Sequence, residues 1–391
     1  MLRLTNTVQP YAWGSTTSIP RLLGREPDGR PQAEVWIGAH PSAPSLADGA
    51  RLDDLVAASP REFLGEGAAP GDRLGFLLKV LAAAAPLSLQ AHPDAGTAAR
   101  RFAEEEAAGV PLDAPHRLYK DTSHKPELLF ALEPFAAMAG FRSPAAAREL
   151  LAGLELPALP AAARDLFDRL LAALAGPDAL REATRLLLTA PGEAVAPLVE
   201  AVARACAPLD DPSAQCVAEL AGHHPGDPGV LVSVLLNQVR LAPGEALYLP
   251  AGNVHAYLSG TGVELMASSD NVLRGGLTPK HVDVPELLDV LDFRELPPPL
   301  LEPRVVSADE QVFCPLPDFA LTVLAVRAES TWERAVPRSV LVLEGRVRLT
   351  SAAGSLELTQ GESAFVTAAE HPVTVSGAGR LAAASPGTPA G

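Results

Sequence analysis

The strongest constraint on the fold of this 391-residue chain is a change of sequence character part-way along it. Residues 143–222 are rich in Ala, Leu, Arg and Glu and place apolar residues at helical spacing, with Pro-Gly and Gly-Pro breakers between the runs. The flanking segments are short, β-branched or aromatic, and interrupted by Gly and Pro, which is typical of antiparallel strands. The sequence therefore predicts four or five helices inserted into a β domain.

A second series of short strands is predicted from residue 319 onwards, at 320–326, 339–343, 346–350, 355–358 and 363–366. Regular short strands with tight turns favour a sandwich or jelly roll. We expect a mainly β protein with an α-helical insertion. Its domains are predicted to be a β domain at 1–142 and 223–296, a helical domain at 143–222, and a C-terminal β domain at 297–391.

Charge and composition exclude several classes of function. The chain has 31 basic and 47 acidic residues, a net charge of −16, and no basic tract, so neither bulk nucleic acid nor an anionic membrane is an expected partner. No apolar run approaches the ~18 residues of a membrane span, and residues 1–10 lack the apolar region of a signal peptide. Three widely spaced cysteines indicate neither a disulfide framework nor a thiolate zinc site. We expect a soluble, cytoplasmic protein.

Lysine is rare in this chain, since only Lys79, Lys120, Lys125 and Lys280 stand against 27 arginines. A chain that strongly favours Arg should keep Lys mainly where a compact, rotatable ammonium does what a planar guanidinium cannot. All four lie within residues 79–125 or 255–283. A cluster of one sign in an acidic protein concentrates an anion locally, so these lysines indicate a site for an anionic substrate.

Residues 244–255, with the sequence GEALYLPAGNVH, resemble the second half of the cupin signature, in which a strand and turn aim one imidazole into a barrel mouth. Ser259 stands where that signature ends in Asn. The alternative is an ordinary hairpin in which His255 is satisfied by a hydrogen bond. The helical segment also ends in a histidine pair, His223 and His224, for which we expect a loop position and no ligand role.

Three further residues are candidates to share a metal ion with His255. Gln90 and His92 lie two apart, so on a strand they face the same way, and Glu127 follows in HKPE at 124–127. Two imidazoles, a carboxylate and an amide oxygen suit Zn²⁺ best, although Mn²⁺ and Fe²⁺ accept the same ligand types. The alternative makes Gln90 a turn residue and Glu127 a surface acid.

Six stretches of the chain together resemble the type I mannose-6-phosphate isomerases, also called phosphomannose isomerases. They follow in order from residue 11 to about residue 293: YAWG at 11–14, EVWIGAHPS at 34–42, LQAHPD at 89–94, HKPE at 124–127, LPAGNVHAY at 249–257 and GVELMASSDNVLRGGLTPK at 262–280. The helical insertion and the C-terminal part match only in general character.

The resemblance implies two cupin-type jelly-roll domains joined to a helical domain, and one Zn²⁺ per chain bound by Gln90, His92, Glu127 and His255. It also implies reversible conversion of D-mannose 6-phosphate to D-fructose 6-phosphate through a cis-enediol. Residues 361–371 echo the cupin half-signature with Thr367 in place of Pro, so the C-terminal domain is expected to have the fold without the metal.

The resemblance further implies individual site residues. It places Trp13, Lys125, Tyr257, Asp270 and Arg274 near the active site, with Lys79, Ser88 and Lys280 at the phosphate end; Glu264 sits in a matching motif. Arg274 suits stabilisation of an enediolate because its guanidinium does not lose its proton. The residue that transfers the proton stays open among Asp270, Glu264, His124 and Lys125, with His124 or Asp270 preferred.

Two other functions compete with the isomerase. A metal-dependent cupin oxygenase usually needs two or three histidines, and Gln90 and the lysine cluster speak against it. A non-catalytic cupin that binds sugar phosphates would be favoured only if Arg274 and the candidate bases proved dispensable. The expected partner is a small sugar phosphate, and the expected state is a monomer.

Overall fold

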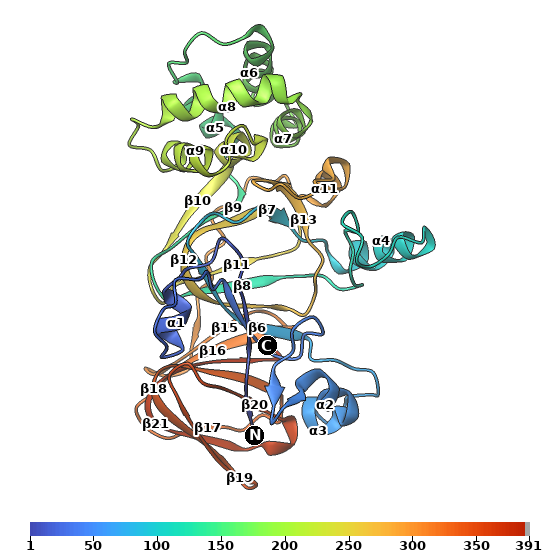
Figure 1. Cartoon of the computed structure of the whole chain (residues 1–391), viewed down its shortest axis with the longest axis vertical. Helices are drawn as coiled ribbons and strands as arrows, with labels where there is room; N and C mark the ends of the chain where they lie inside the picture. The colour runs from blue at the N-terminus through green and yellow to red at the C-terminus, as the bar shows by residue number, and fades with distance from the viewer. Residues whose placement is uncertain (388–391) are drawn as a thin grey trace.

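The computed structural model describes residues 1–387 and stacks three bodies along its long axis (Figure 1). A helical domain lies at one end, a β domain occupies the middle, and a second β domain lies at the other end. The chain leaves the middle domain after β9 (Phe135–Phe141), forms the helices, and returns through β10 (Leu236–Leu241). This arrangement confirms the mainly β fold with a helical insertion.

The middle domain is built on a ten-stranded sheet that folds over on itself. Its main path is β10-β9-β12-β6-β3-β2, while the pairs β8–β11 and β7–β13 join it through β12. The remaining strands are β2 (Thr7–Gln9), β3 (Glu34–Ile37), β6 (Phe76–Ala83), β7 (Leu89–Ala91), β8 (Glu127–Ala131), β11 (Ala246–Leu249), β12 (His255–Ala267) and β13 (Leu273–Gly276).

The long strand β12 belongs to both layers of this domain. Its first part, from His255 to Ser259, pairs with β9, and its second part, from Gly260 to Ala267, pairs with β6. Gly260 forms the corner at φ +120°, and a Cβ there would lie 2.6 Å from the carbonyl oxygen of Pro134. Only glycine fits this bend, which lets one strand carry residues to two walls of the same interior.

The second β domain is a nine-stranded sheet ordered β1-β20-β18-β21-β16-β15-β14, with β17 on β21 and β19 on β18. Its strands are β1 (Leu2–Leu4), β14 (Arg304–Val305), β15 (Glu310–Leu316), β16 (Phe319–Val326), β17 (Ser330–Trp332), β18 (Arg338–Ser351), β19 (Gly354–Thr359), β20 (Ser363–Val366) and β21 (Val373–Ser385). The strands predicted at 339–343 and 346–350 are one continuous strand, β18, whose register shifts between Val342 and Glu344.

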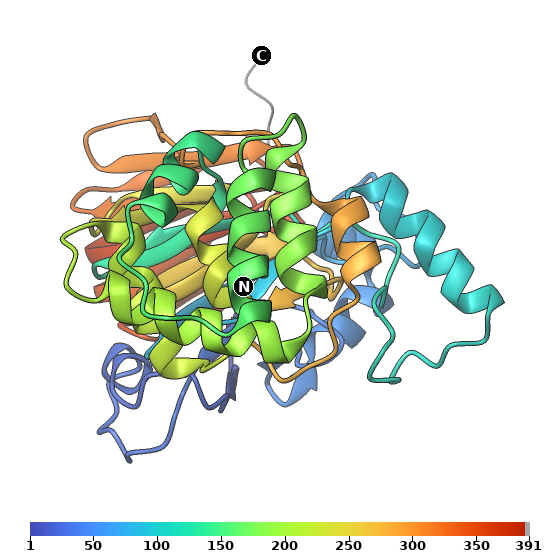
Figure 2. The ribbon, with the colours of Figure 1, turned by 90° about the horizontal axis from the view of Figure 1, so that it is seen from above.

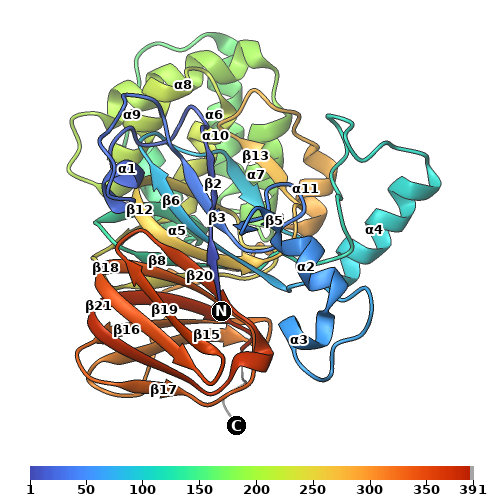
Figure 3. The same cartoon turned by 60° about the horizontal axis from the view of Figure 1, so that its bottom comes forward.

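The N-terminus contributes to this second sheet rather than to the middle domain. Strand β1 pairs antiparallel with β20, so residues 2–4 lie beside residues 363–365, and Figure 3 shows the N-terminus beside that sheet. The predicted domain that begins at residue 1 therefore differs from the structure here. A strand of three residues has no periodicity that reveals a partner about 360 positions away.

The helical domain covers one end of the middle domain, as the view from above shows (Figure 2). Its helices are α5 (Pro144–Ala152), α6 (Ala161–Ala173), α7 (Ala179–Thr189), α8 (Gly192–Cys206), α9 (Pro212–His223) and α10 (Pro228–Val232). The helical segment thus extends past the predicted end at 222. The sequence PGDPG at 225–229 suggests a loop, yet Asp227 caps α10 by accepting a hydrogen bond from the backbone N–H of Gly229.

Further helices belong to the segments outside the helical domain. These are α1 (Ser18–Leu22), α2 (Leu52–Ala58), α3 (Pro60–Leu64), α4 (Ala95–Ala107) and α11 (Val284–Val290), of which α4 projects to one side (Figure 1). Strands β4 (Leu46–Ala47) and β5 (Ala50–Arg51) form a separate hairpin. Among the helices of residues 1–387, none alone has the length and apolarity to cross a membrane; α7 and α8 pass that test only as a pair, bent by 113°.

One layer of the middle domain separates two very different environments. Alternate residues of β6, β8 and β12 point toward the C-terminal domain, where Val80, Phe130 and Val263 join a core that includes Phe313 and Phe365. Residues of the opposite parity on these strands line the interior of the middle domain. Their side chains include charged groups, as described below, so this layer is apolar on its outer face and polar on its inner face.

The contact between the two β domains predicts a stability effect. Phe313 is fully buried, and its ring lies 5.4 Å from that of Phe130 across the domain boundary. We expect Phe313→Ala to lower the free energy of unfolding by about 3–5 kcal/mol, because it leaves a cavity in this shared core. Urea denaturation measures the change. Val305→Ala, at a side chain that is 65% exposed, serves as control and should change it by less than about 0.5 kcal/mol. Equal effects of the two substitutions would contradict a shared core.

Candidate functional site

Three buried side chains converge inside the middle domain. His92 follows β7, while Glu127 and His255 open β8 and β12, and their ligand atoms all lie within 4.8 Å of one another. The Nε2 atom of His92 is 3.2 Å from Oε1 of Glu127, and Nε2 of His255 is 3.3 Å from Oε2. Each of the three residues is only 1% exposed. The sheet brings together groups that the sequence spreads over more than 160 positions.

The other ring nitrogens fix how the two imidazoles are protonated. Nδ1 of His92 lies 2.7 Å from the carbonyl oxygen of Asn271, and Nδ1 of His255 lies 3.0 Å from that of Asn253. A carbonyl only accepts, so each Nδ1 is the protonated nitrogen and each Nε2 carries a lone pair. Both Nε2 atoms and Oε2 of Glu127 are buried and have no hydrogen-bond partner within the part of the chain that the structure describes. Such atoms are costly unless a ligand satisfies them, so this group fits a metal ion.

Gln90 lies next to this group. It lines the same pocket as Glu127 and is the register partner of His255 on one side and of Arg274 on the other. Side chains of register partners share one face of a sheet. The amide, two imidazoles and carboxylate predicted as a ligand set therefore occur in one small region of the fold.

Electrostatics hold the metal-binding groups in the form that binds a cation. Burial, with Lys125 nearby, lowers the pKa of His92 to about 4, so its ring is neutral. Burial raises the pKa of Glu127, but Lys125 and the two imidazoles outweigh it and bring the pKa well below its usual value. Nζ of Lys125 donates to Oε1 of Glu127 over 2.6 Å. Neutral imidazole and ionised carboxylate are the protonation states that metal binding requires.

A second buried charge cluster surrounds Lys79 on the neighbouring strands. Nζ of Lys79 lies 3.2 Å from Oε2 of Glu264 and 3.7 Å from Oε1 of Glu34, and 4.9 Å from the ring centroid of Trp36. Although burial lowers the pKa of Lys79, the two carboxylates raise it above its usual value. The positive charge of Lys79 is therefore neutralised within the protein.

Residues of both clusters line one pocket of about 690 Å³, the metal pocket. The structure brings most of the predicted site residues to its lining: Trp13, Lys79, Ser88, Gln90, Lys125, Glu127, Tyr257, Glu264, Arg274 and Lys280. Trp13 and Tyr257 supply apolar surface, and Tyr257 is buried enough to raise the pKa of its phenol well above the usual value. The lining combines aromatic walls with charged groups, as a sugar-phosphate site requires.

Two cations of this pocket lack a carboxylate partner among residues 1–387. Burial lowers the pKa of Arg274, and burial together with Arg274 lowers the pKa of Lys280. Both side chains line the same pocket. Uncompensated positive charges facing one cavity favour an anionic ligand.

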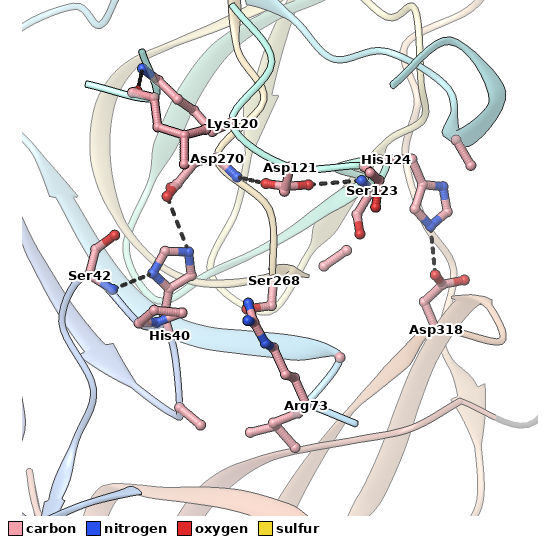
Figure 4. A pocket seen from close by; sticks show the side chains of 18 residues that line it. His40, Ser42, Arg73, Lys120, Asp121, Ser123, His124, Ser268, Asp270 and Asp318 are labelled. Atoms are coloured by element: carbon pink, nitrogen blue, oxygen red, sulfur yellow. Dashed lines mark hydrogen bonds and ion pairs between the residues drawn. The ribbon is translucent and has the colours of Figure 1, made fainter. Parts of the chain in front are cut away.

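His124 and Asp270, the two preferred candidates for proton transfer, lie elsewhere. They line a second cavity of about 1010 Å³ (Figure 4). There, Nε2 of His124 is 2.6 Å from Oδ1 of Asp318, and Nε2 of His40 is 3.5 Å from Oδ2 of Asp270. His124 faces away from its neighbour Lys125, which lines the metal pocket. The structure therefore does not bring these two residues into the lining that the other candidates share.

Asn271 is a site residue that sequence reasoning did not single out. Its fully buried amide donates to the carbonyl oxygens of Asp121 and Ser123, both over 2.8 Å, and accepts from the backbone N–H of Lys120. Its backbone carbonyl accepts from Nδ1 of His92. Residue 271 thus ties the segment before Lys125, through its side-chain amide, to a metal-binding histidine, through its backbone. Asn271 lies inside the motif at 262–280, but its side chain forms hydrogen bonds with a segment 150 positions earlier.

The histidine pair at the end of α9 lies beside the same site. His223 closes α9, His224 follows it, and both line the metal pocket together with Arg274 and Lys280. Sequence reasoning expected a loop position and no ligand role, and it did not place the pair at this pocket. No local pattern could have placed them there, because the contact arises from how the helical domain is set on the β domain.

Two family models match the chain. "Phosphomannose isomerase type I, catalytic domain" matches residues 1–144, and "Mannose-6-phosphate isomerase, cupin domain" matches residues 309–386. The second match lies within the C-terminal sheet and agrees with the jelly-roll fold expected for that domain.

Curated relatives match along nearly the whole chain. Mannose-6-phosphate isomerase from Escherichia coli is 40% identical over 98% of both chains, and that from Salmonella typhimurium is 39% identical over the same shares. The enzyme from Bos taurus is 31% identical, covering 94% of this chain and 93% of its own.

Solved structures show the same fold over the same length. The metal-free mannose 6-phosphate isomerase from Salmonella typhimurium superposes with a TM-score of 0.90 at 38% identity, covering 99% of both chains. A zinc-bound mannose 6-phosphate isomerase gives a TM-score of 0.89 at the same identity and coverage. By its full-length sequence identity, its family-model matches and its fold, this chain belongs to the type I phosphomannose isomerase family.

Proposed function

We propose that this chain is a zinc-dependent aldose–ketose isomerase that interconverts D-mannose 6-phosphate and D-fructose 6-phosphate. The observation that carries the proposal is the buried group of His92, Glu127 and His255 beside two cations, Arg274 and Lys280, that lack a carboxylate partner among the described residues. A metal site next to an anion site is what this reaction requires, and membership of the family supports the same substrates.

The metal would be held by His92, Glu127, His255 and Gln90. The unpartnered Nε2 atoms and the unpartnered carboxylate oxygen support this assignment, and so does the zinc bound to a relative of 38% identity. When bound, Zn²⁺ supplies a Lewis acid that polarises carbonyl and hydroxyl oxygens. The buried charges favour a cation as well, because the three carboxylates of Glu34, Glu127 and Glu264 outnumber the two ammonium groups of Lys79 and Lys125.

The chain's own residues meet the main barrier of the reaction, which is removal of a proton from C2 beside a carbonyl. After ring opening, this proton leaves C2, a cis-enediol forms, and a proton returns to C1. Negative charge develops on the oxygens of C1 and C2. We assign its stabilisation to Arg274, whose guanidinium is preorganised on β13 and stays protonated throughout.

Four residues are candidates for the proton transfer itself. Lys125 and Glu264 line the metal pocket, and burial raises the pKa of Glu264 above its usual value. His124 and Asp270 face the second cavity, so they act on the substrate only if the sugar reaches past Lys125. We keep all four as candidates.

We assign the phosphate group to Lys280 and Ser88, with Arg274 close by. The charge of Lys79 is already balanced by Glu34 and Glu264, so its proposed role is to hold these carboxylates in the wall of the pocket. Trp13 and Tyr257 are proposed to flank the sugar.

We also propose a monomeric, cytoplasmic enzyme with the domain limits expected above, apart from strand β1 and helix α10. The cysteines support a reducing compartment, because no disulfide occurs within residues 1–387. An oxygenase is less well supported, since the proposed ligand set contains Gln90 where a third histidine would be usual.

A coupled assay with and without a chelator tests the proposed function. Purified protein should contain about one zinc per chain and convert mannose 6-phosphate to fructose 6-phosphate, and removal of the metal should abolish the activity, because the polarised carbonyl is lost. Elemental analysis and coupled detection of fructose 6-phosphate measure both quantities. Activity that survives complete metal removal would refute the zinc dependence, and metal-containing protein that binds but does not convert the substrate would refute the isomerase.

Substitution of Lys280 tests the phosphate site. Lys280→Ala should raise KM for mannose 6-phosphate roughly tenfold or more, because a charge-assisted contact to phosphate is lost. KM for unphosphorylated D-mannose should stay nearly constant. Steady-state kinetics with both sugars measure the difference, and equal increases for the two would remove Lys280 from the phosphate site.

Substitution of Arg274 tests its role at the enediolate. Arg274→Lys should lower kcat by about a hundredfold or more with only a modest change in KM, because a compact ammonium does not reproduce the planar donor array. Initial rates over a range of substrate concentrations separate the two constants. An unchanged kcat would exclude Arg274 from the chemical step.

A further inference from the structure

The helical domain is joined to the phosphate end of the pocket through one carboxylate. We infer that Asp227, in the turn between α9 and α10, is a positioning residue that holds the loop at 277–280, which follows β13, for the phosphate group of the substrate. The inference rests on the proposed function, in which the ligand is a sugar phosphate. It gives the helical domain a part in substrate binding.

The Asp227 carboxylate accepts hydrogen bonds from two parts of the chain. Its Oδ1 accepts from the backbone N–H of Gly229 over 2.7 Å, which caps α10. The same oxygen accepts from the backbone N–H of Leu277 over 2.9 Å, and Oδ2 accepts from that of Thr278 over 3.3 Å. Two of the three hydrogen bonds that the Asp227 carboxylate accepts therefore come from a loop 50 positions later. Capping α10 needs only the bond from Gly229.

The loop adopts a conformation that needs such support. Leu277 has φ +55°, in the left-handed region that non-glycine residues rarely occupy. Its side chain is 2% exposed and packs in the same apolar cluster as Val230 and Leu231 of α10. The Asp227 carboxylate and this packing together hold a backbone turn that would otherwise relax.

The two turns approach closely at a glycine on each side. A Cβ on Gly276 would lie 2.9 Å from Oδ1 of Asp227 and 2.9 Å from Cα of Gly229. A Cβ on Gly229 would lie 2.9 Å from the backbone nitrogen of Leu277. Both glycines are therefore needed for the close approach, so the position of α10 sets the position of the loop.

Two cations flank the clamped residues. Arg274, assigned to the enediolate, precedes them in β13, and Lys280, assigned to the phosphate, follows them; both line the metal pocket. His223 and His224, at the start of the same turn as Asp227, line this pocket too. Asp227 itself pairs with neither cation: its described partners are backbone N–H groups. A carboxylate near an anion site would repel the ligand, so its function here is to position the loop rather than to attract substrate.

Kinetics and phosphate binding of three variants test the inference. Asp227→Ala removes the clamp, and Gly229→Ala keeps the carboxylate but forces the two turns apart. Asp211→Ala is the matched control, because Asp211 caps α9 by accepting from Ser213 and Ala214, both over 2.9 Å, without touching the loop. Asp227→Ala and Gly229→Ala should each raise KM for mannose 6-phosphate and Kd for inorganic phosphate roughly tenfold, with kcat within about threefold of wild type. Asp211→Ala should lower thermal stability without changing these constants.

Asp227→Asn separates positioning from charge. The amide keeps Oδ1 as an acceptor for Gly229 and Leu277, so KM and Kd should stay within about threefold of wild type. If the charge alone mattered, both Asp227→Asn and Asp227→Ala would bind phosphate more tightly, and this result would overturn the inference. So would an Asp227→Ala variant that behaves like Asp211→Ala. Should Asp227→Ala fail to fold, Gly229→Ala and Asp227→Asn decide the question.

Calorimetric binding of inorganic phosphate separates this inference from the proposed function. Wild-type protein that lacks isomerase activity but binds phosphate in a way that Gly229→Ala weakens would refute the function and leave the positioning role intact. Active wild-type protein whose phosphate affinity is unaffected by Gly229→Ala and Asp227→Ala would refute the positioning role alone.

Discussion

The site depends on charged groups that are buried on one face of a β layer whose other face is a hydrophobic core. Lys79, Glu127 and Glu264 point inward from three adjacent strands, while Val80, Phe130 and Val263 next to them pack against the C-terminal domain. A buried charge is tolerated only when it is paired and hydrogen-bonded. Here the pairing is incomplete at the metal site, where the buried atoms without a partner among residues 1–387 include the two imidazole nitrogens and one carboxylate oxygen.

Strand β12 explains how one short stretch of sequence builds two walls of the site. Its bend at Gly260 sends His255 to the metal group and Glu264 to Lys79 in the other layer. The C-terminal domain then acts through this layer, by covering its apolar face. Asp318 of the C-terminal domain also contacts His124 in the second cavity. This domain has no metal-binding group among its described residues, yet it makes a direct contact near the site.

The cations that line the metal pocket are of two kinds. Lys79 and Lys125 are matched by buried carboxylates and help to shape the pocket. Among residues 1–387, Arg274 and Lys280 have no carboxylate partner; Arg274 lies in β13, and Lys280 ends the loop that the helical domain holds in place. A rigid support matters for such a site, because two like charges kept close together repel each other until the anion arrives. The rarity of lysine thus indicated the region of the site but not the role of each lysine.

The sequence by itself determined the mainly β fold, the helical insertion, the ligand types around His255 and the family. These features are encoded locally, as periodicity within one strand or helix and as motifs of a few residues. Only the tertiary structure decided that β1 joins the C-terminal sheet, that Glu34 and Glu264 neutralise Lys79, that His124 and Asp270 face a separate cavity, and that Asp227 reaches the loop after β13. Periodicity shows which way a side chain points, but its partner is set by strand register and domain packing between segments far apart in the chain.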